Sequence, residues 1–157
     1  MYERIIIPLD GSKVGEAALP YVEQLVAKLS PEVKVEVTLL QVLSKMTYPV
    51  VAGEVVATVP YTENEMAQIK QKAVDYLNQA GEALGRKGIV VTARVAIGDA
   101  SEEIVKAAND VNADLIAMST HGRSGLSRWA FGSVTDKVLK LGGQAPILIV
   151  KGKEVEE

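Results

Sequence analysis

The chain has 157 residues, enough for one domain with a sizeable core. Hydrophobic residues make up 48% of it and aromatic residues only 4%, a balance common where parallel strands are buried on both faces. The net charge of −3 gives no electrostatic indication of nucleic-acid binding, for which proteins are usually markedly basic, and the lack of cysteine excludes disulfides and thiolate chemistry.

No apolar run approaches the length of a membrane span, and residues 1–4 lead into the first apolar run without the layout of a signal peptide. We therefore expect a cytoplasmic protein with no membrane partner. The chain contains no internal repeat, linker or shift in composition. A single domain over residues 1–157 is the expectation.

The chain begins with a predicted strand, helix and strand. Residues 4–10 form an apolar run closed by Asp-Gly-Ser, which is typical of a buried strand. Ser12 is a suitable N-cap for a helix that runs to about residue 29. Pro20 falls inside that helix and predicts a kink or one unpaired carbonyl. Residues 33–43 alternate and then run apolar, which predicts a second strand.

Residues 44–61 lack a clear period and contain two prolines and a glycine, so we expect a long loop. A loop of this length in a compact domain is usually functional or mobile. Thr62 and Glu65 then form a capping box, and apolar residues behind it keep helical spacing as far as Leu84. The Gly-Arg-Lys-Gly run at 85–88 predicts the end of this helix and a turn.

The second half of the chain continues to alternate between strands and helices. The predicted elements are a strand over 89–97 ended by Gly98, a helix over 99–111 that opens with a capping pattern at Asp99 and Glu102, a strand over 113–118, a helix over 134–141 and a strand over 147–150. Residues 151–157 form a charged tail that we expect to be frayed.

Alternating strands and helices predict an open five-stranded parallel sheet with helices on both faces, a Rossmann-like α/β fold. We expect the strand order 3-2-1-4-5 in sequence numbering. Ligands of such sheets bind beyond the carboxyl ends of the strands, where the strand order reverses. That point lies between the first and fourth strands, where the Asp-Gly-Ser turn at 10–12 meets the segment 119–133.

The segment 119–133 is rich in glycine and carries two arginines. Gly122 and Gly125 permit positive φ and a close approach of the backbone to a ligand. Gly132 and Ser133 stand at the expected start of a helix, where free N–H groups and the helix dipole favour an anion. Arg123 can add charge-assisted hydrogen bonds to phosphate oxygens, as can Arg128. The alternative is an ordinary βα loop whose arginines face solvent.

Asp10 is placed to accept hydrogen bonds from a sugar hydroxyl. The sequence lacks the P-loop motif and the common dinucleotide fingerprint. His121 is the only histidine, and no serine has the elbow motif of a nucleophilic triad. We therefore see no constellation of residues for efficient catalysis.

At these residues the chain strongly resembles the universal stress protein family. The ATP-binding branch of that family carries the motif G-x2-G-x9-G-[ST] after the fourth strand, and Gly122, nine further residues and Gly132-Ser133 match its latter part. Ser119 stands where the motif has its first glycine. The likeness also covers Ile-Ile-Ile-Pro-Leu-Asp-Gly-Ser at 5–12 and Gly-Asp-Ala-Ser-Glu-Glu-Ile at 98–104.

The resemblance implies an adenine nucleotide alpha hydrolase-like fold and a homodimer in which each subunit binds ATP, with Mg²⁺ or Mn²⁺ held by the phosphates. Pro8, Leu9 and Asp10 would line the adenosine site, and Val42 would contact adenine through its backbone. Gly98 would close one wall. The remaining contacts implied by the resemblance would come from Met118, Gly122, Gly132, Ser133 and Val134. The composition of the glycine-rich segment adds Ser119, Arg123 and Gly125 as candidates.

Residues 147–150 form an apolar edge strand in the predicted order, and such an edge must be covered or paired. Pairing with its symmetry mate would give an isologous dimer.

Three functions remain open at this stage. The first is an ATP-binding regulator of the stress response with slow or absent hydrolysis and an unidentified protein partner. The others are a weak ATPase and a nucleotide-free dimeric interaction module.

Overall fold

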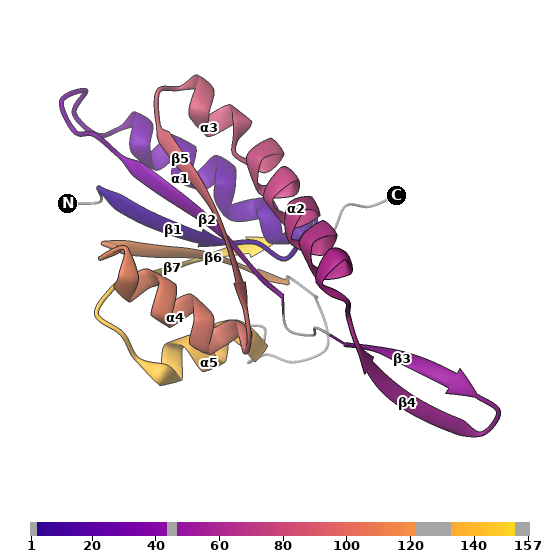
Figure 1. Ribbon diagram of the computed structural model, residues 1–157. Helices are drawn as coiled ribbons and strands as arrows, with labels where there is room; N and C mark the ends of the chain where they lie inside the picture. Colours follow the sequence, from indigo (N-terminus) through magenta and orange to yellow (C-terminus); the bar gives the residue numbers. More distant parts are fainter. Residues whose placement is uncertain (1–2, 44–46, 122–132, 153–157) are drawn as a thin grey trace.

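The computed structural model describes residues 3–43, 47–121 and 133–152. Within these residues the main sheet has five parallel strands in the order β5-β2-β1-β6-β7 (Figure 1). The strands are β1 (Arg4–Pro8), β2 (Glu36–Leu43), β5 (Val90–Ile97), β6 (Leu115–His121) and β7 (Ile147–Gly152). This order is the predicted 3-2-1-4-5, so the predicted fold class is confirmed.

Helices cover both faces of the sheet (Figure 1). The helical elements are the 3₁₀ turn η1 (Val14–Ala17), α1 (Ala18–Ala27), α2 (Glu63–Ala80), α3 (Glu82–Arg86), α4 (Ala100–Asp110) and α5 (Ser133–Leu141). The first three α-helices lie on one face, and α4 and α5 lie on the other. None of the helices among the described residues is long and apolar enough to cross a membrane.

Strand β1 shows why a continuous apolar run suits a sheet covered on both faces. Ile5 and Ile7 point into the hydrophobic cluster under α1 and α2, while Ile6 points into the cluster under α4 and α5. All three side chains are at most 1% exposed. Alternate residues of a strand face opposite sides, so a centre strand buried on both needs apolar residues at every position.

The first helix differs from the prediction at Pro20. The chain forms η1 first and begins α1 at Ala18, which puts Pro20 in the first turn of the α-helix. The first N–H groups of a helix have no partner within it, so proline is tolerated there. The expected kink or unpaired carbonyl at Pro20 is therefore wrong.

The predicted loop over 44–61 is also wrong for its described part. Strands β3 (Thr47–Ala52) and β4 (Val55–Pro60) pair antiparallel as a separate two-stranded hairpin that extends away from the body (Figure 1). Gly53, with φ of 64°, is the first of two turn residues, the position where a type II′ turn requires glycine. A hairpin with both faces in solvent has no buried side, so it shows no alternation in the sequence.

Two strands extend beyond their predicted ends. Strand β6 continues to His121, and β7 pairs with it as far as Gly152. The first two residues of the predicted tail therefore belong to the sheet, and residues 153–157 lie outside the described residues. The cap of α2 is confirmed, because Thr62 and Glu65 make both hydrogen bonds of a capping box.

Candidate functional site

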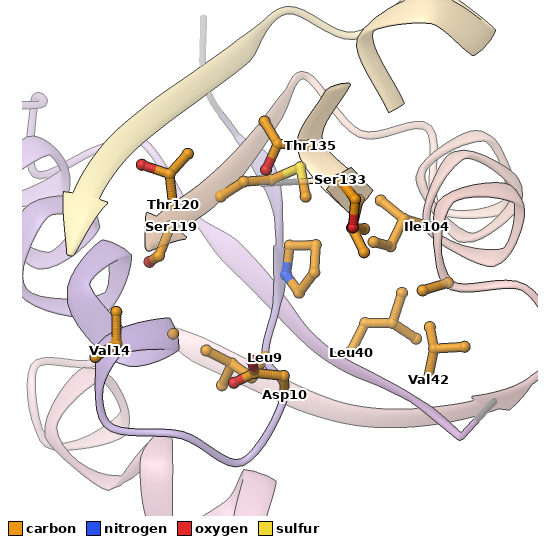
Figure 2. Close-up of a pocket in the computed structure, with 15 residues that line it drawn as sticks. Leu9, Asp10, Val14, Leu40, Val42, Ile104, Ser119, Thr120, Ser133 and Thr135 are labelled. Carbon is orange, nitrogen blue, oxygen red and sulfur yellow. The ribbon is translucent and has the colours of Figure 1, made fainter. Parts of the chain in front are cut away.

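A cavity of about 250 Å³ opens at the carboxyl ends of β1 and β6, where the order of the strands reverses. Figure 2 shows the residues around it. They come from the ends of three strands and the starts of three helical elements. The lining residues are Pro8, Leu9, Asp10, Val14, Gly15, Leu40, Val42, Ala100, Ile104, Met118, Ser119, Thr120, Ser133, Val134 and Thr135.

The structure brings most of the described candidate residues together. Eight of them line this one cavity, namely Pro8, Leu9, Asp10, Val42, Met118, Ser119, Ser133 and Val134. Four more, Gly122, Arg123, Gly125 and Gly132, lie outside the described residues, as does Arg128. Their proposed contacts remain predictions.

Gly98 is not among the residues that line the cavity. It lies between β5 and α4 with φ of 146°, a conformation that favours glycine. An ideal Cβ there would lie 3.0 Å from Oε1 of Glu103. Ala100, two residues later and the first residue of α4, lines the cavity instead.

Seven lining residues were not predicted, and the sequence holds a signal for only some of them. Leu40 precedes Val42 on the same face of β2, and Ile104 follows the capping pattern at the start of α4. The alternation of faces along a strand, the spacing of apolar residues in a helix and the strand order would together have predicted both residues. Val14 and Gly15 carry no such signal, because their place depends on how η1 packs. The others are Ala100, Thr120 and Thr135.

The cavity has an apolar side and a hydroxyl-bearing side. Leu40, Val42 and Ile104 lie together on one side, and Ser119 lies on the other (Figure 2). Apolar walls with a few converging polar groups are typical of small-molecule sites. The described residues contain no group of three or more acidic or histidine side chains that would hold a metal ion.

Asp10 lies in a tight turn after β1. The backbone N–H of Ser12 donates to Oδ1 of Asp10 at 2.9 Å, and the Ser12 hydroxyl donates to the same oxygen at 2.6 Å. The Ser12 hydroxyl in turn accepts a hydrogen bond from the N–H of Gly15 at 3.0 Å. Ser12 thus orients the carboxylate. The residue that caps η1 is Lys13, one position after the predicted Ser12, and it makes no side-chain capping bond.

The negative charge of this turn also acts on its surroundings. Burial, together with the nearby carboxylates of Glu16 and Asp10, raises the pKa of Tyr76 on α2 to about 12. A tyrosine is protonated at physiological pH even at its ordinary pKa of about 10, and the raised pKa extends that range to still higher pH.

Ser119 makes a contact between distant parts of the chain. Its Oγ accepts a hydrogen bond of 2.9 Å from the backbone N–H of Ala18, where α1 begins. In Figure 2 the side chain points toward the turn that carries Val14. The serine that replaces the motif glycine thus serves as a cap for a helix 101 residues away in the sequence.

Helix α5 begins at the opposite side of the cavity. Ser133 is its first described residue and is exposed, while Thr135 is only 2% exposed. The N–H groups in the first turn of a helix lack partners within it, and the dipole there favours negative charge. This end of the cavity is therefore suited to an anion such as a phosphate.

Fold and cavity together define a doubly wound α/β protein with a ligand site at its topological switch point. The model of the universal stress protein family matches residues 1–151. The chain belongs to the universal stress protein family, as the sequence predicted.

Relatives and solved structures agree with this assignment. Universal stress protein MJ0577 of Methanocaldococcus jannaschii is 32% identical over 163 residues, which covers 98% of this chain and 97% of MJ0577. The solved structure of MJ0577 aligns over 99% of both chains with a TM-score of 0.72 and 28% identity.

Two more distant structures share the fold. A universal stress protein in complex with cAMP covers 97% of this chain and 98% of its own, with 19% identity and a TM-score of 0.65. A family protein from Arabidopsis thaliana with AMP bound covers 96% of this chain and 92% of its own, with 15% identity and a TM-score of 0.62.

Proposed function

We propose that the cavity at the switch point binds an adenine nucleotide, with ATP as the physiological ligand. The observation that carries the proposal is the convergence of eight candidate residues on one cavity, from β1 and the turn after it, β2, β6 and α5. The family provides further support, since two of its members were solved with cAMP and with AMP.

In this proposal the adenosine lies against the apolar side of the cavity, between Leu40, Val42 and Ile104. Asp10 accepts hydrogen bonds from the ribose hydroxyls. The phosphates lie at the start of α5, where Ser133 and the free N–H groups receive them. Gly122, Arg123, Gly125 and Gly132 complete the phosphate site. A Mg²⁺ or Mn²⁺ ion would be held by the phosphates themselves.

We also propose that the protein is a cytoplasmic homodimer that acts as a nucleotide-dependent regulator in the stress response. Strand β7 is the outermost strand of the main sheet and pairs with β6 along one edge only, within the described residues. Residues 147–150 are only partly buried in a single chain. Pairing of β7 with its symmetry mate would bury this edge.

Nucleotide extraction is the direct test of the binding proposal. The purified protein is denatured, and the released material is identified by chromatography. We expect an adenine nucleotide, or binding of added ATP measured by isothermal titration calorimetry. A protein that releases none and binds none at millimolar ATP would instead support the nucleotide-free interaction module.

The dimer and the rate of hydrolysis need separate measurements. Light scattering during size-exclusion chromatography should give twice the chain mass of 16.8 kDa, and a monomer at micromolar concentration would overturn the dimer.

We expect little or no phosphate release from ATP with magnesium. A steady turnover that disappears in the Asp10→Ala variant would favour the weak ATPase instead.

A further inference from the structure

Two contacts fasten η1, the helical turn that forms one wall of the cavity. The first is the hydrogen bond from the Ala18 N–H to Ser119 on β6. The second is the close packing of Gly152, at the end of β7, against Val14. An ideal Cβ on Gly152 would overlap Cγ1 of Val14 and would lie 2.8 Å from the Thr120 carbonyl oxygen. Any larger residue at position 152 must therefore displace η1 or the end of the sheet.

The position of η1 also determines the position of Asp10. The N–H of Gly15 within η1 donates to the Ser12 hydroxyl, which donates to Oδ1 of Asp10. An ideal Cβ on Gly15 would lie 2.5 Å from this same Oδ1, so the carboxylate lies directly against the turn. A shift of η1 therefore either presses on the carboxylate or lengthens these hydrogen bonds, and in both cases it changes the position of Oδ1.

We propose that Ser119 and Gly152 are positioning residues that set the orientation of the Asp10 carboxylate through η1. This inference rests on the proposed function, in which Asp10 binds the ribose. The two contacts come from different strands and hold opposite ends of η1, since Val14 begins the turn and Ala18 follows it. Ser119, in place of the motif glycine, thereby gains a role that glycine has no side chain to perform.

The test compares Gly152→Ala with Gly85→Ala, measured by titration calorimetry with adenosine and with ATP. Gly85 is a matched control, since an ideal Cβ there meets no atom within 4 Å. We expect Gly152→Ala to weaken binding of both ligands by the same factor, about tenfold or more, as for a lost hydrogen bond to a charged group. Equal losses follow because the ribose is common to both ligands. Gly85→Ala should leave both affinities unchanged.

A double-mutant cycle separates positioning from a general loss of structure. If Gly152 acts through Asp10, then Gly152→Ala should cause little further loss in an Asp10→Asn background. A purely structural role would multiply the two losses. Should Gly152→Ala fail to fold, Ser119→Ala tests the other contact, because it removes the hydroxyl and keeps Cβ. We expect a smaller loss of about threefold, non-additive with Asp10→Asn and restored in Ser119→Thr.

The possible failures are distinguishable. If the wild-type protein binds adenosine and ATP but the losses multiply, or if the variants bind as tightly as wild type, the positioning role is wrong and the proposed function stands. If the wild-type protein binds neither ligand, the proposed function fails, and the positioning role fails with it.

Discussion

Two strand pairs of this molecule have similar side chains and opposite surroundings. Strands β1 and β2 lie in the middle of the main sheet beside the cavity, whereas β3 and β4 extend into solvent (Figure 1). Val37 of β2 is 1% exposed, and Val51 of β3 is 68% exposed. Valine favours extended backbone in both places, but only neighbouring strands and helices bury it. The presence of valine therefore does not tell whether a strand is part of the core.

The main sheet and the β3–β4 hairpin should differ in stability. An isolated two-stranded hairpin is at best marginally stable in water, and this one carries a single charged side chain, Glu54. The sheet around the cavity is held by the two hydrophobic clusters on its faces. The proposed nucleotide site lies in the more stable region.

Hydrogen exchange should show the largest difference between the regions. Amides of β1 and β2 should exchange only on global unfolding, which costs about 5–15 kcal/mol in a typical domain. Amides of β3 and β4 should exchange at least about a thousandfold faster, because opening the hairpin exposes little buried surface. Mass spectrometry of labelled peptides measures both rates in one sample. Equal protection would mean that the hairpin is packed against another surface in solution.

Matched valine substitutions should give the next largest difference. Val37→Ala removes buried methyl groups from the cluster under α1 and α2 and should cost about 2 kcal/mol of the free energy of unfolding. Val51→Ala makes the same chemical change on the hairpin and should cost less than about 0.5 kcal/mol. Urea unfolding followed by circular dichroism measures both. A loss of similar size at both positions would contradict the contrast.

The regions also differ in how well sequence predicted them. The apolar run Ile5-Ile6-Ile7 predicted a strand buried on both faces. The predicted strand order then placed Asp10 and Ser133 at the same edge of the sheet, beyond the carboxyl ends of its strands. The hairpin was missed because Val50-Val51 and Val55-Val56 run apolar without alternation, beside prolines that disfavour strands. The roles of Ser119 and Gly152 were missed because their partners, Ala18 and Val14, lie more than a hundred residues away in the sequence.

Removing the cap of α2, which follows the hairpin directly, should cause a smaller loss of stability than Val37→Ala. Thr62→Ala removes the hydroxyl that accepts from the Glu65 N–H at 3.2 Å, and loss of such a cap costs about 1 kcal/mol. Thr58→Ala, on the exposed strand β4, should change stability by less than about 0.5 kcal/mol. Thermal unfolding of the two variants beside the wild type measures the difference. If Thr58→Ala costs as much as Thr62→Ala, the hairpin contributes to the folded core.

The smallest expected effect is a loss of stability of the main sheet at acid pH. The Asp114 carboxylate accepts hydrogen bonds from the N–H groups of Arg4 and Glu3 at 2.9 and 3.1 Å, which lowers the pKa of Asp114. A carboxyl whose pKa is lower in the folded state stabilises the protein above its ordinary pKa, about 3.9, and loses that contribution as the pH falls through the folded-state value.

Replacing this carboxylate should therefore matter only above that range of pH. The Asp114→Asn variant should be less stable than wild type at pH 7, and the gap should narrow at pH values below about 4. Urea unfolding at pH 7, 5, 4 and 3 measures the gap. Glu54→Gln on the hairpin is the matched control and should give no gap at any pH, because the tip of the hairpin makes no described ion pair. A constant gap for Asp114→Asn would mean that the carboxylate charge does not help to hold β1 at the start of the sheet.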